Sequence, residues 1–157
     1  MHFEEIIAKL NNEATSERDK GYKFELLIKN WLLYEKLYRE NIDKIYLWSE
    51  FPLKKQFGSG QDIGIDIVAT TKNGEYWAIQ CKCYDEGTLV SKEDVAKFVA
   101  ASNRLFAKDP QYPNRKSIFD QRFFIASTNN WTDHAIHEAH DQQNRIIRSC
   151  VHKKNML

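Results

Sequence analysis

Apolar residues three and four positions apart predict two amphipathic helices near the start of the chain. The first is expected over residues 3–11, and Thr15 or Ser16 is a capping signal for the second, expected over residues 18–39. The apolar positions are Phe3, Ile6, Ile7 and Leu10 in the first helix, and Phe24, Leu27, Ile28, Trp31, Tyr34 and Tyr38 in the second.

Shorter stretches with alternating or continuous apolar residues predict strands further along the chain. Ser91, with Asp94 three residues later, resembles a capping box at the start of another helix. The expected strands cover residues 45–51, 62–70, 75–84, 122–127 and 145–151; the expected helices cover 91–106 and 131–142, and the expected loops 52–60 and 108–117. The order α-α-β-β-β-α-β-α-β predicts an α/β fold, a sandwich of helices around a central mixed β-sheet.

The composition indicates one folded domain. The chain has 157 residues, of which 42% are hydrophobic and 13% aromatic, enough for a single core. Because no stretch is apolar enough for a membrane span or a signal peptide, we expect a cytoplasmic protein without a membrane partner. Three cysteines, an odd number, favour reduced thiols over a disulfide framework. The sequence stops soon after the last expected strand, so we expect residues 1–157 to be one domain of a longer polypeptide.

The charge of the chain is almost balanced, with a formal net charge of +1. Residues 1–57 carry ten basic and ten acidic groups, and residues 58–157 carry thirteen and twelve. A DNA-binding domain that works alone usually has a strong basic excess, because neutralising phosphates drives its affinity. If this chain acts on DNA, another domain is therefore expected to deliver the DNA to it.

The strongest chemical signal is Asp66, followed after thirteen residues by Gln80 and then Lys82. Alternation along the expected strand places Ile65 and Ile67 on one face and Asp66 on the other. An acid on one strand beside a Gln-x-Lys on its neighbour is the arrangement that a magnesium-dependent phosphodiesterase needs.

The turn between the two strands decides whether these residues meet. A two-residue turn at residues 73–74 would pair Asp66 with Cys81 and turn the acid to the wrong face. A three-residue loop over 72–74, with glycine in the left-handed conformation, pairs Asp66 with Gln80. We therefore expect the three-residue loop, or a compensating bulge.

The residue types suggest the role of each group. Mg²⁺ prefers hard oxygen ligands, which Asp66, the Gln80 amide and the Cys81 backbone carbonyl can supply. Glu25, on the second helix, is expected to contribute through a metal-bound water. Lys82 would orient or help to deprotonate the attacking water and stabilise the charge that develops on the phosphate.

Several motifs support this hypothesis by resemblance. They are Gly21-Tyr22-Lys23-Phe24-Glu25, Gly64-Ile65-Asp66-Ile67-Val68-Ala69, Gln80-Cys81-Lys82-Cys83-Tyr84 and Phe124-Ile125-Ala126-Ser127-Thr128. In order and spacing they resemble the Mrr-type branch of the PD-(D/E)xK nucleases. Residues 17–21, 76–80 and 91–94 further resemble the amino-terminal nuclease of Type ISP restriction-modification enzymes. The chain departs from the family pattern in having Ile65 instead of proline and Gln80 instead of a carboxylate, and the second change predicts weak metal binding without DNA.

The resemblance implies a restriction-endonuclease-like fold and Mg²⁺-dependent cleavage of double-stranded DNA, with Mn²⁺ as an alternative ion in vitro. Asp66, Gln80 and Lys82 would be catalytic, supported by Glu25. It also implies that a helicase-like motor, a methyltransferase and a target-recognition domain follow in the same polypeptide, and that ATP acts only through them. The nuclease itself would have no sequence specificity, would be monomeric in isolation and would work in a prokaryotic cytoplasm.

Four further residues are candidates for DNA contact. Ser127 and Thr128 lie between an expected strand and an expected helix, where they could either contact a phosphate or cap the helix. Lys54 and Lys55, in an expected loop, could flank a DNA path or could be ordinary solvated lysines.

Two alternative functions stay open. The first is a nuclease fold that only binds DNA or docks a protein, which predicts loss of the catalytic set. The second is a resolvase or RNA-processing nuclease of the same fold, and a resolvase would be expected to act as a dimer.

Overall fold

A computed structural model describes residues 3–59, 63–85, 87–140 and 145–151. The helices are α1 (Phe3–Glu13), α2 (Glu17–Tyr34), α3 (Lys36–Arg39), α4 (Lys92–Ser102) and α5 (Asp133–His140), with 3-10 turns η1 (Trp48–Glu50) and η2 (Lys54–Phe57). The strands are β1 (Ile42–Leu47), β2 (Ile67–Thr71), β3 (Tyr76–Lys82), β6 (Gln121–Ala126) and β7 (Ile146–Cys150), and a small separate hairpin of β4 (Phe106–Ala107) and β5 (Lys116–Ser117).

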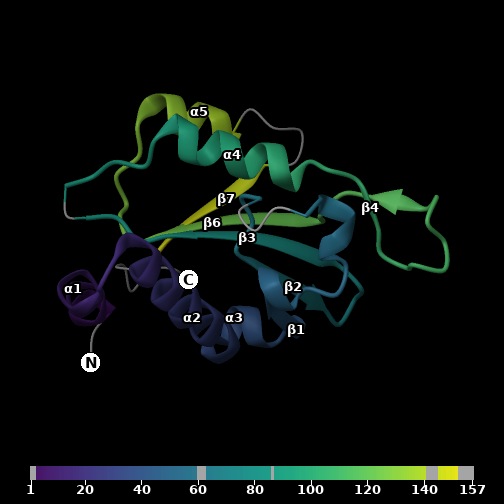
Figure 1. The fold of residues 1–157 in the computed structure, drawn as a ribbon, viewed down its shortest axis with the longest axis horizontal. Helices are drawn as coiled ribbons and strands as arrows, with labels where there is room; N and C mark the ends of the chain where they lie inside the picture. Colours follow the sequence, from purple (N-terminus) through teal and green to yellow (C-terminus); the bar gives the residue numbers. More distant parts are fainter. Residues whose placement is uncertain (1–2, 60–62, 86, 141–144, 152–157) are drawn as a thin grey trace.

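The described strands form a mixed five-stranded sheet in the order β1-β2-β3-β6-β7. The pairs β1–β2 and β2–β3 are antiparallel, whereas β6 and β7 run parallel to β3. Helices α2 and α3 cover one face of the sheet, and α4 and α5 cover the other (Figure 1). This architecture confirms the expected α/β/α sandwich. Within the described ranges, no helix has both the length and the apolar character needed to cross a bilayer.

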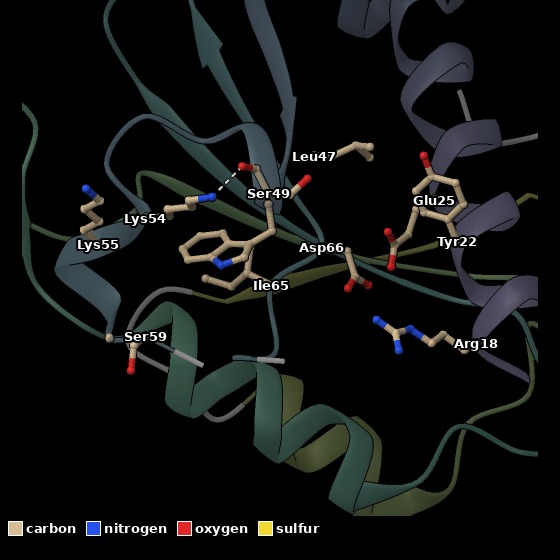
Figure 2. A pocket seen from close by; sticks show the side chains of 12 residues that line it. Arg18, Tyr22, Glu25, Leu47, Ser49, Lys54, Lys55, Ser59, Ile65 and Asp66 are labelled. Atoms are coloured by element: carbon tan, nitrogen blue, oxygen red, sulfur yellow. Dashed lines mark hydrogen bonds between the residues drawn. The ribbon is translucent and has the colours of Figure 1, made fainter. Parts of the chain in front are cut away.

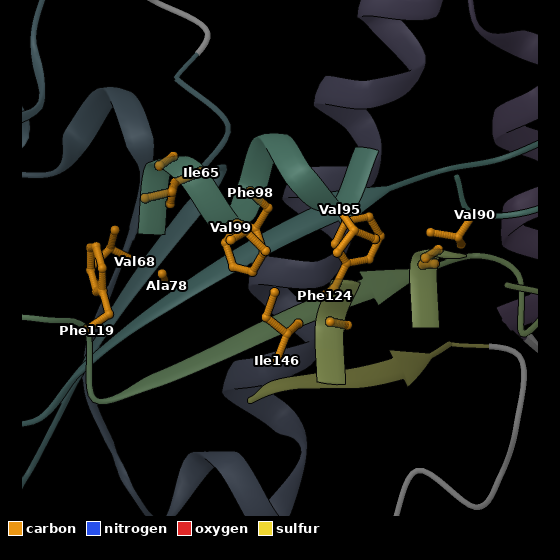
Figure 3. Packing of buried hydrophobic residues seen from close by; sticks show 14 of the residues in the cluster. Ile65, Val68, Ala78, Val90, Val95, Phe98, Val99, Phe119, Phe124 and Ile146 are labelled. Carbon is orange, nitrogen blue, oxygen red and sulfur yellow. The ribbon is translucent and has the colours of Figure 1, made fainter. Parts of the chain in front are cut away.

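Each face of the sheet has its own hydrophobic core, because side chains alternate along a strand. On the α2 side, Phe24 and Ile28 pack with Ile67 and Ile79. On the α4 side, the residues that pack together include Val68, Ala78, Phe98 and Phe124 (Figure 3). The central strands β2 and β3 are therefore held from both faces, which makes them a rigid support for polar groups at their ends.

The long helix expected over residues 18–39 is interrupted at Glu35, which corrects the sequence prediction. Glu35 has an extended backbone, with φ −71° and ψ 120°, and it separates α2 from α3. The turn lets Tyr38 pack against the rings of Trp31 and Trp77, with centroids 5.3 Å and 6.5 Å away. Tertiary packing of aromatic rings thus overrides a continuous helical pattern.

The first strand begins and ends earlier than the expected range of 45–51. β1 starts at Ile42 and ends at Leu47, where the chain enters the turn η1. The Leu47 N–H donates to Oε1 of Glu50 at 2.9 Å, which stabilises this turn.

The second strand is shorter than the expected range of 62–70, because β2 begins only at Ile67. Gly64 has a φ of +95°, which a regular strand does not allow. Ile65 therefore packs in the core on the α4 side and Ile67 in the core on the α2 side, so the prediction that both share one face is wrong. Asp62 lies outside the described residues.

The remaining elements lie close to their expected positions. The Asp94 N–H donates to Oγ of Ser91 at 3.2 Å, which confirms the predicted cap of α4. The helix ends at Ser102 and not at residue 106, because Phe106 pairs with Ser117 in the small hairpin. Strands β6 and β7 agree with the prediction to within a residue at each end, whereas residues 141–142 of the expected last helix lie outside the described part.

Candidate active site

The hairpin between β2 and β3 has the loop that the site requires. The Gly74 N–H donates to the Thr71 carbonyl at 3.0 Å, the Thr71 N–H donates to the Glu75 carbonyl at 3.0 Å, and Gly74 has a φ of +81°. These bonds define a three-residue loop with glycine in the left-handed region, as predicted. The register that follows pairs Val68 with Ala78.

The ladder becomes irregular at Asp66, just before β2 begins. Ile67 pairs with Ile79, yet the Asp66 N–H also donates to the Ile79 carbonyl, at 3.1 Å. Two successive residues thus face a single partner, which is the local pattern of a bulge. On its other side, the Asp66 carbonyl accepts from the Trp48 N–H at 2.8 Å, so the backbone of Asp66 is held between β3 and the end of β1.

The carboxylate of Asp66 reaches across to β3. Its Oδ2 accepts a hydrogen bond from the Cys81 N–H at 2.9 Å. The N–H and C=O of one strand residue point toward the same neighbouring strand, so the Cys81 carbonyl also faces the Asp66 side. One carboxylate and one backbone carbonyl are therefore available as oxygen ligands at the point where the strands separate.

Gln80 supplies a buried side-chain oxygen. Its Oε1 is buried and accepts no hydrogen bond within the described part of the chain. Leaving a buried acceptor unsatisfied costs about 1–3 kcal/mol. An amide oxygen in this state, next in sequence to Cys81, fits the donor chemistry of a divalent cation.

Lys82 lies on the same face of β3 as Gln80, toward α4. Its Nζ is 3.3 Å from Oδ1 of Asp94, and Oδ2 of Asp94 accepts from the Tyr84 hydroxyl at 2.7 Å. Burial raises the pKa of Tyr84, and the Asp94 carboxylate raises it further, so the hydroxyl stays a donor. Asp94 therefore links the lysine to a fixed phenol.

Glu25 and Asp66 line a common pocket of about 690 Å³. Their carboxyl groups lie near each other in Figure 2, and Glu25 comes from α2. Burial raises the pKa of the Cys81 thiol, and the charges of Asp66 and Glu25 raise it further. The pocket residues are Arg18, Tyr22, Glu25, Leu47, Trp48, Ser49, Lys54, Lys55, Gly58, Ser59, Ile65 and Asp66.

The structure thus brings some of the predicted residues together and keeps others apart. Asp66, Glu25, Lys54 and Lys55 line the pocket, whereas Gln80 and Lys82 are not among its lining residues. Asp66 connects the two groups through its bond to the Cys81 backbone. Among the described residues, no three side chains of the His, Cys, Asp and Glu types gather around a possible metal position. A metal here would depend on amide and carbonyl oxygens beside the carboxylates.

The two hydroxyl residues after β6 have internal roles in this structure. Ser127 is buried, and its Oγ accepts from the Tyr84 N–H at 2.7 Å and donates to the Tyr84 carbonyl at 3.3 Å. Thr128 Oγ1 accepts from the Asn130 N–H at 3.2 Å, so it stabilises a local turn. Thr132, and neither of these, accepts from the Ala135 N–H at the start of α5. The helix-cap interpretation is therefore wrong for both residues, and a phosphate contact stays a prediction.

Three residues around the site are functional candidates that the sequence argument did not select. Arg18 and Tyr22 line the pocket, and Asp94 contacts Lys82. The first two could have been found from their spacing to Glu25, because positions 18, 22 and 25 share one helical face. Asp94 was already assigned to the capping pattern that begins three residues earlier at Ser91, so a contact with the lysine was not considered.

Comparisons with known proteins agree with this fold. A family model described as a restriction endonuclease, Mrr_cat_2, matches residues 33–154. No protein with a curated description matches the chain. Among solved structures, the ATP-dependent Type ISP restriction-modification enzyme LlaBIII bound to DNA is similar in fold, with a TM-score of 0.61 and 23% sequence identity. That match covers 91% of this chain but only 8% of the larger enzyme. Since the family match extends over most of the sequence, the chain belongs to the Mrr-type restriction endonuclease family.

Proposed function

We propose that residues 1–157 form the Mg²⁺-dependent endodeoxyribonuclease domain of a Type ISP restriction-modification enzyme, cutting double-stranded DNA without sequence specificity of its own. The observation that carries this proposal is the hydrogen bond from the Cys81 N–H to Asp66. It brings the carboxylate to the residue of β3 that follows Gln80, whose buried Oε1 has no hydrogen-bond partner among the described residues. The Asp66 carboxylate, the Cys81 carbonyl and the Gln80 amide oxygen would then supply the ligands of the ion. These are hard ligands of the kind that Mg²⁺ prefers.

Each residue of the site would have its own role in DNA cleavage. Asp66, Gln80 and the Cys81 carbonyl would hold the ion, and Glu25 would act through a bound water. When bound, Mg²⁺ neutralises phosphate charge and lowers the pKa of a water nucleophile. Lys82 would stabilise the charge that develops on the phosphate and help to orient the attacking water.

The wider context of the protein is part of the same proposal. A net charge of +1 gives the domain little capacity to attract DNA by itself. We expect a helicase-like motor, a methyltransferase and a target-recognition domain in the same polypeptide, in a prokaryotic cytoplasm. ATP would act through the motor alone, and the isolated domain would be a monomer.

A non-catalytic DNA-binding role is the second candidate. It is favoured by one observation, that Gln80 and Lys82 do not line the pocket that contains Asp66 and Glu25. A protein that only binds DNA does not need these residues to meet. A nuclease must bring Gln80 and Lys82 together with Asp66 and Glu25 when DNA and metal bind.

The experiment compares the full-length protein with its Asp66→Ala and Lys82→Ala variants. Strand breaks should vanish in both, while ATP hydrolysis and translocation persist. Asp43→Ala and Lys44→Ala are matched controls, because both residues are exposed on β1 outside the pocket. A variant of Asp66 or Lys82 that still cut at the parental rate would remove that residue from the site, and a parental protein that binds but never cuts DNA with Mg²⁺ or Mn²⁺ would favour the second candidate.

A further inference from the structure

One face of α2 points into the pocket instead of a core. Arg18, Tyr22 and Glu25 follow each other at intervals of four and three residues, so they lie along one side of the helix, and all three line the pocket. Tyr22 is 53% exposed, whereas Phe24 and Ile28, on the core-facing side of the same helix, are fully buried. This face of α2 is therefore accessible to a ligand that enters the pocket.

Arg18 is the charged group on this face that lacks a partner among the described residues. Neither an ion pair nor a hydrogen bond links its side chain to any described residue. The nearby cations of α2 are paired: Lys20 with Glu17 at 3.2 Å and Asp85 at 2.9 Å, and Lys23 with Asp19 at 3.0 Å. A cation in the first turn of a helix is also unfavourable, because the amino-terminal end of the helix dipole is positive. Folding thus gives no reason for an arginine at this position.

The surroundings of Arg18 suit a polyanion that carries a metal at its centre. Figure 2 shows its guanidinium directed toward the side of the pocket that holds Asp66 and Glu25. Lys54 and Lys55 lie on the other side of Asp66 (Figure 2). The two carboxylates lie between basic side chains on either side. This arrangement suits a DNA strand, in which one phosphate would contact a metal held by the carboxylates and the neighbouring phosphates would contact the basic side chains. The planar fork of arginine can bind two phosphate oxygens at once.

We propose that Arg18 binds a backbone phosphate of the DNA strand that enters the pocket, next to the phosphate that is cleaved. This inference rests on the proposed function only in taking DNA as the occupant of the pocket. It assigns Arg18 to substrate binding and gives α2 a second role beside the placement of Glu25.

Binding can be measured separately from cleavage, by fluorescence anisotropy of a labelled DNA duplex with the 157-residue chain in EDTA. The titration uses high protein concentration and starts from low salt, where even a nearly neutral domain binds DNA weakly. Arg18→Ala should raise the dissociation constant about five- to tenfold and reduce the slope of log K against log salt by about 0.9, the value for one lost phosphate contact. Arg18→Lys should keep the slope, because it keeps the charge. Arg39→Ala is the matched control: Arg39 is an exposed arginine of α3 outside the pocket, and its removal should change neither quantity.

Thermal unfolding of each variant separates a binding defect from a folding defect, and an exposed arginine should leave it unchanged. If Arg18→Ala binds like Arg39→Ala with the same salt slope, while Asp66→Ala of the full-length protein no longer cuts, the Arg18 inference is overturned and the nuclease assignment stands. If Asp66→Ala cuts at the parental rate, the proposed function fails and the inference falls with it.

Discussion

The carboxylate of Asp66 and the backbone N–H of Cys81 are joined at 2.9 Å across the gap where β2 and β3 separate. This bond does not depend on a metal, so it orients the acid in the free protein. Asp66 also lines the pocket that contains Glu25, so this bond connects the pocket to residues 80–82 of β3. The role of charge at Asp66 can therefore be tested without removing the hydrogen bond.

Asp66→Asn should keep the fold and abolish cleavage. The amide oxygen of asparagine can still accept from the Cys81 N–H, whereas the negative charge that Mg²⁺ needs is lost. We expect plasmid cleavage to fall at least about 100-fold, since even residues that merely support metal ligands cost 10–100-fold when changed. The melting temperature in EDTA should stay close to the parental value, and parental cleavage by this variant would contradict a metal role for the charge.

Gln80→Glu should make the stability of the protein depend on a divalent ion. The Oε1 of Gln80 is buried, so a carboxylate in its place is destabilising unless a cation neutralises it. We expect a lower melting temperature in EDTA and a larger increase on adding Mg²⁺ than in the parental protein. In Gln80→Met, which removes the buried acceptor and keeps a similar length, the melting temperature should not respond to Mg²⁺. An equal response of all three proteins would show that no ion binds beside residue 80.

Asp94→Asn should slow cleavage and leave DNA binding intact. Oδ1 of Asp94 lies 3.3 Å from Nζ of Lys82, and its other oxygen accepts from the Tyr84 hydroxyl at 2.7 Å. The amide can keep one of these contacts but cannot attract the ammonium group, so Lys82 loses its fixed position. We expect kcat to fall about tenfold, within the contribution of a positioned proton-transfer group, with KM unchanged. Glu93→Gln, an exposed neighbour in the same turn of α4, is the control, and equal rates for both variants would exclude a positioning role.

The sequence predicted the parts of the fold that local chemistry determines. The three-residue loop over 72–74 was predicted correctly from Gly74, because glycine alone easily adopts a φ of +81° there. The break at Glu35 was not predictable in this way, since neither glycine nor proline marks it. It results from the packing of Tyr38 on Trp77, two residues from distant parts of the chain. Long-range packing, and not a local signal, ended that helix.

The same distinction applies to the site. The requirement that Asp66 and Gln80 lie on the same face of the sheet correctly predicted a three-residue loop. It assumed, however, a regular strand that begins at residue 62. The positive φ of Gly64 sends Ile65 to the core opposite that of Ile67, so Asp66 emerges from a bulge and not from a pleated strand. Arg18 was missed because its spacing to Glu25, which places both on one helical face, was not considered when Glu25 was selected.

Glu50 makes the turn after β1 sensitive to acid. Its carboxylate accepts from the Leu47 N–H and pairs with Lys29 at 3.0 Å, and both contacts lower its pKa below the usual value of 4.5. Because the folded-state pKa lies below the unfolded one, the stabilisation is complete above pH 4.5 and is lost as pH falls through the folded-state pKa. The effect should be less than about 1 kcal/mol, since the side chain is half exposed. Urea unfolding of the parental protein and Glu50→Gln should show a difference at pH 6 that shrinks toward pH 3, and a constant difference would contradict this account.

Gly64, two residues before Asp66, packs closely against Lys97 of α4. Replacing Gly64 should show whether the backbone at this contact can move. A Cβ at Gly64 would lie 2.9 Å from the carbonyl oxygen of Lys97, which belongs to the helix backbone and cannot rotate away. Gly58 is a matched control, because it also has a positive φ, of +100°, but a Cβ there would meet no atom within 4 Å. Both alanine variants incur the strain of the positive φ, about 1–3 kcal/mol, and only Gly64→Ala adds the clash. We expect urea unfolding to show Gly64→Ala less stable than Gly58→Ala by at least about 1 kcal/mol, in the range of overpacked sites. Equal stability of the two variants would mean that α4 can move away from Gly64, and that Asp66 is not held in place from that side.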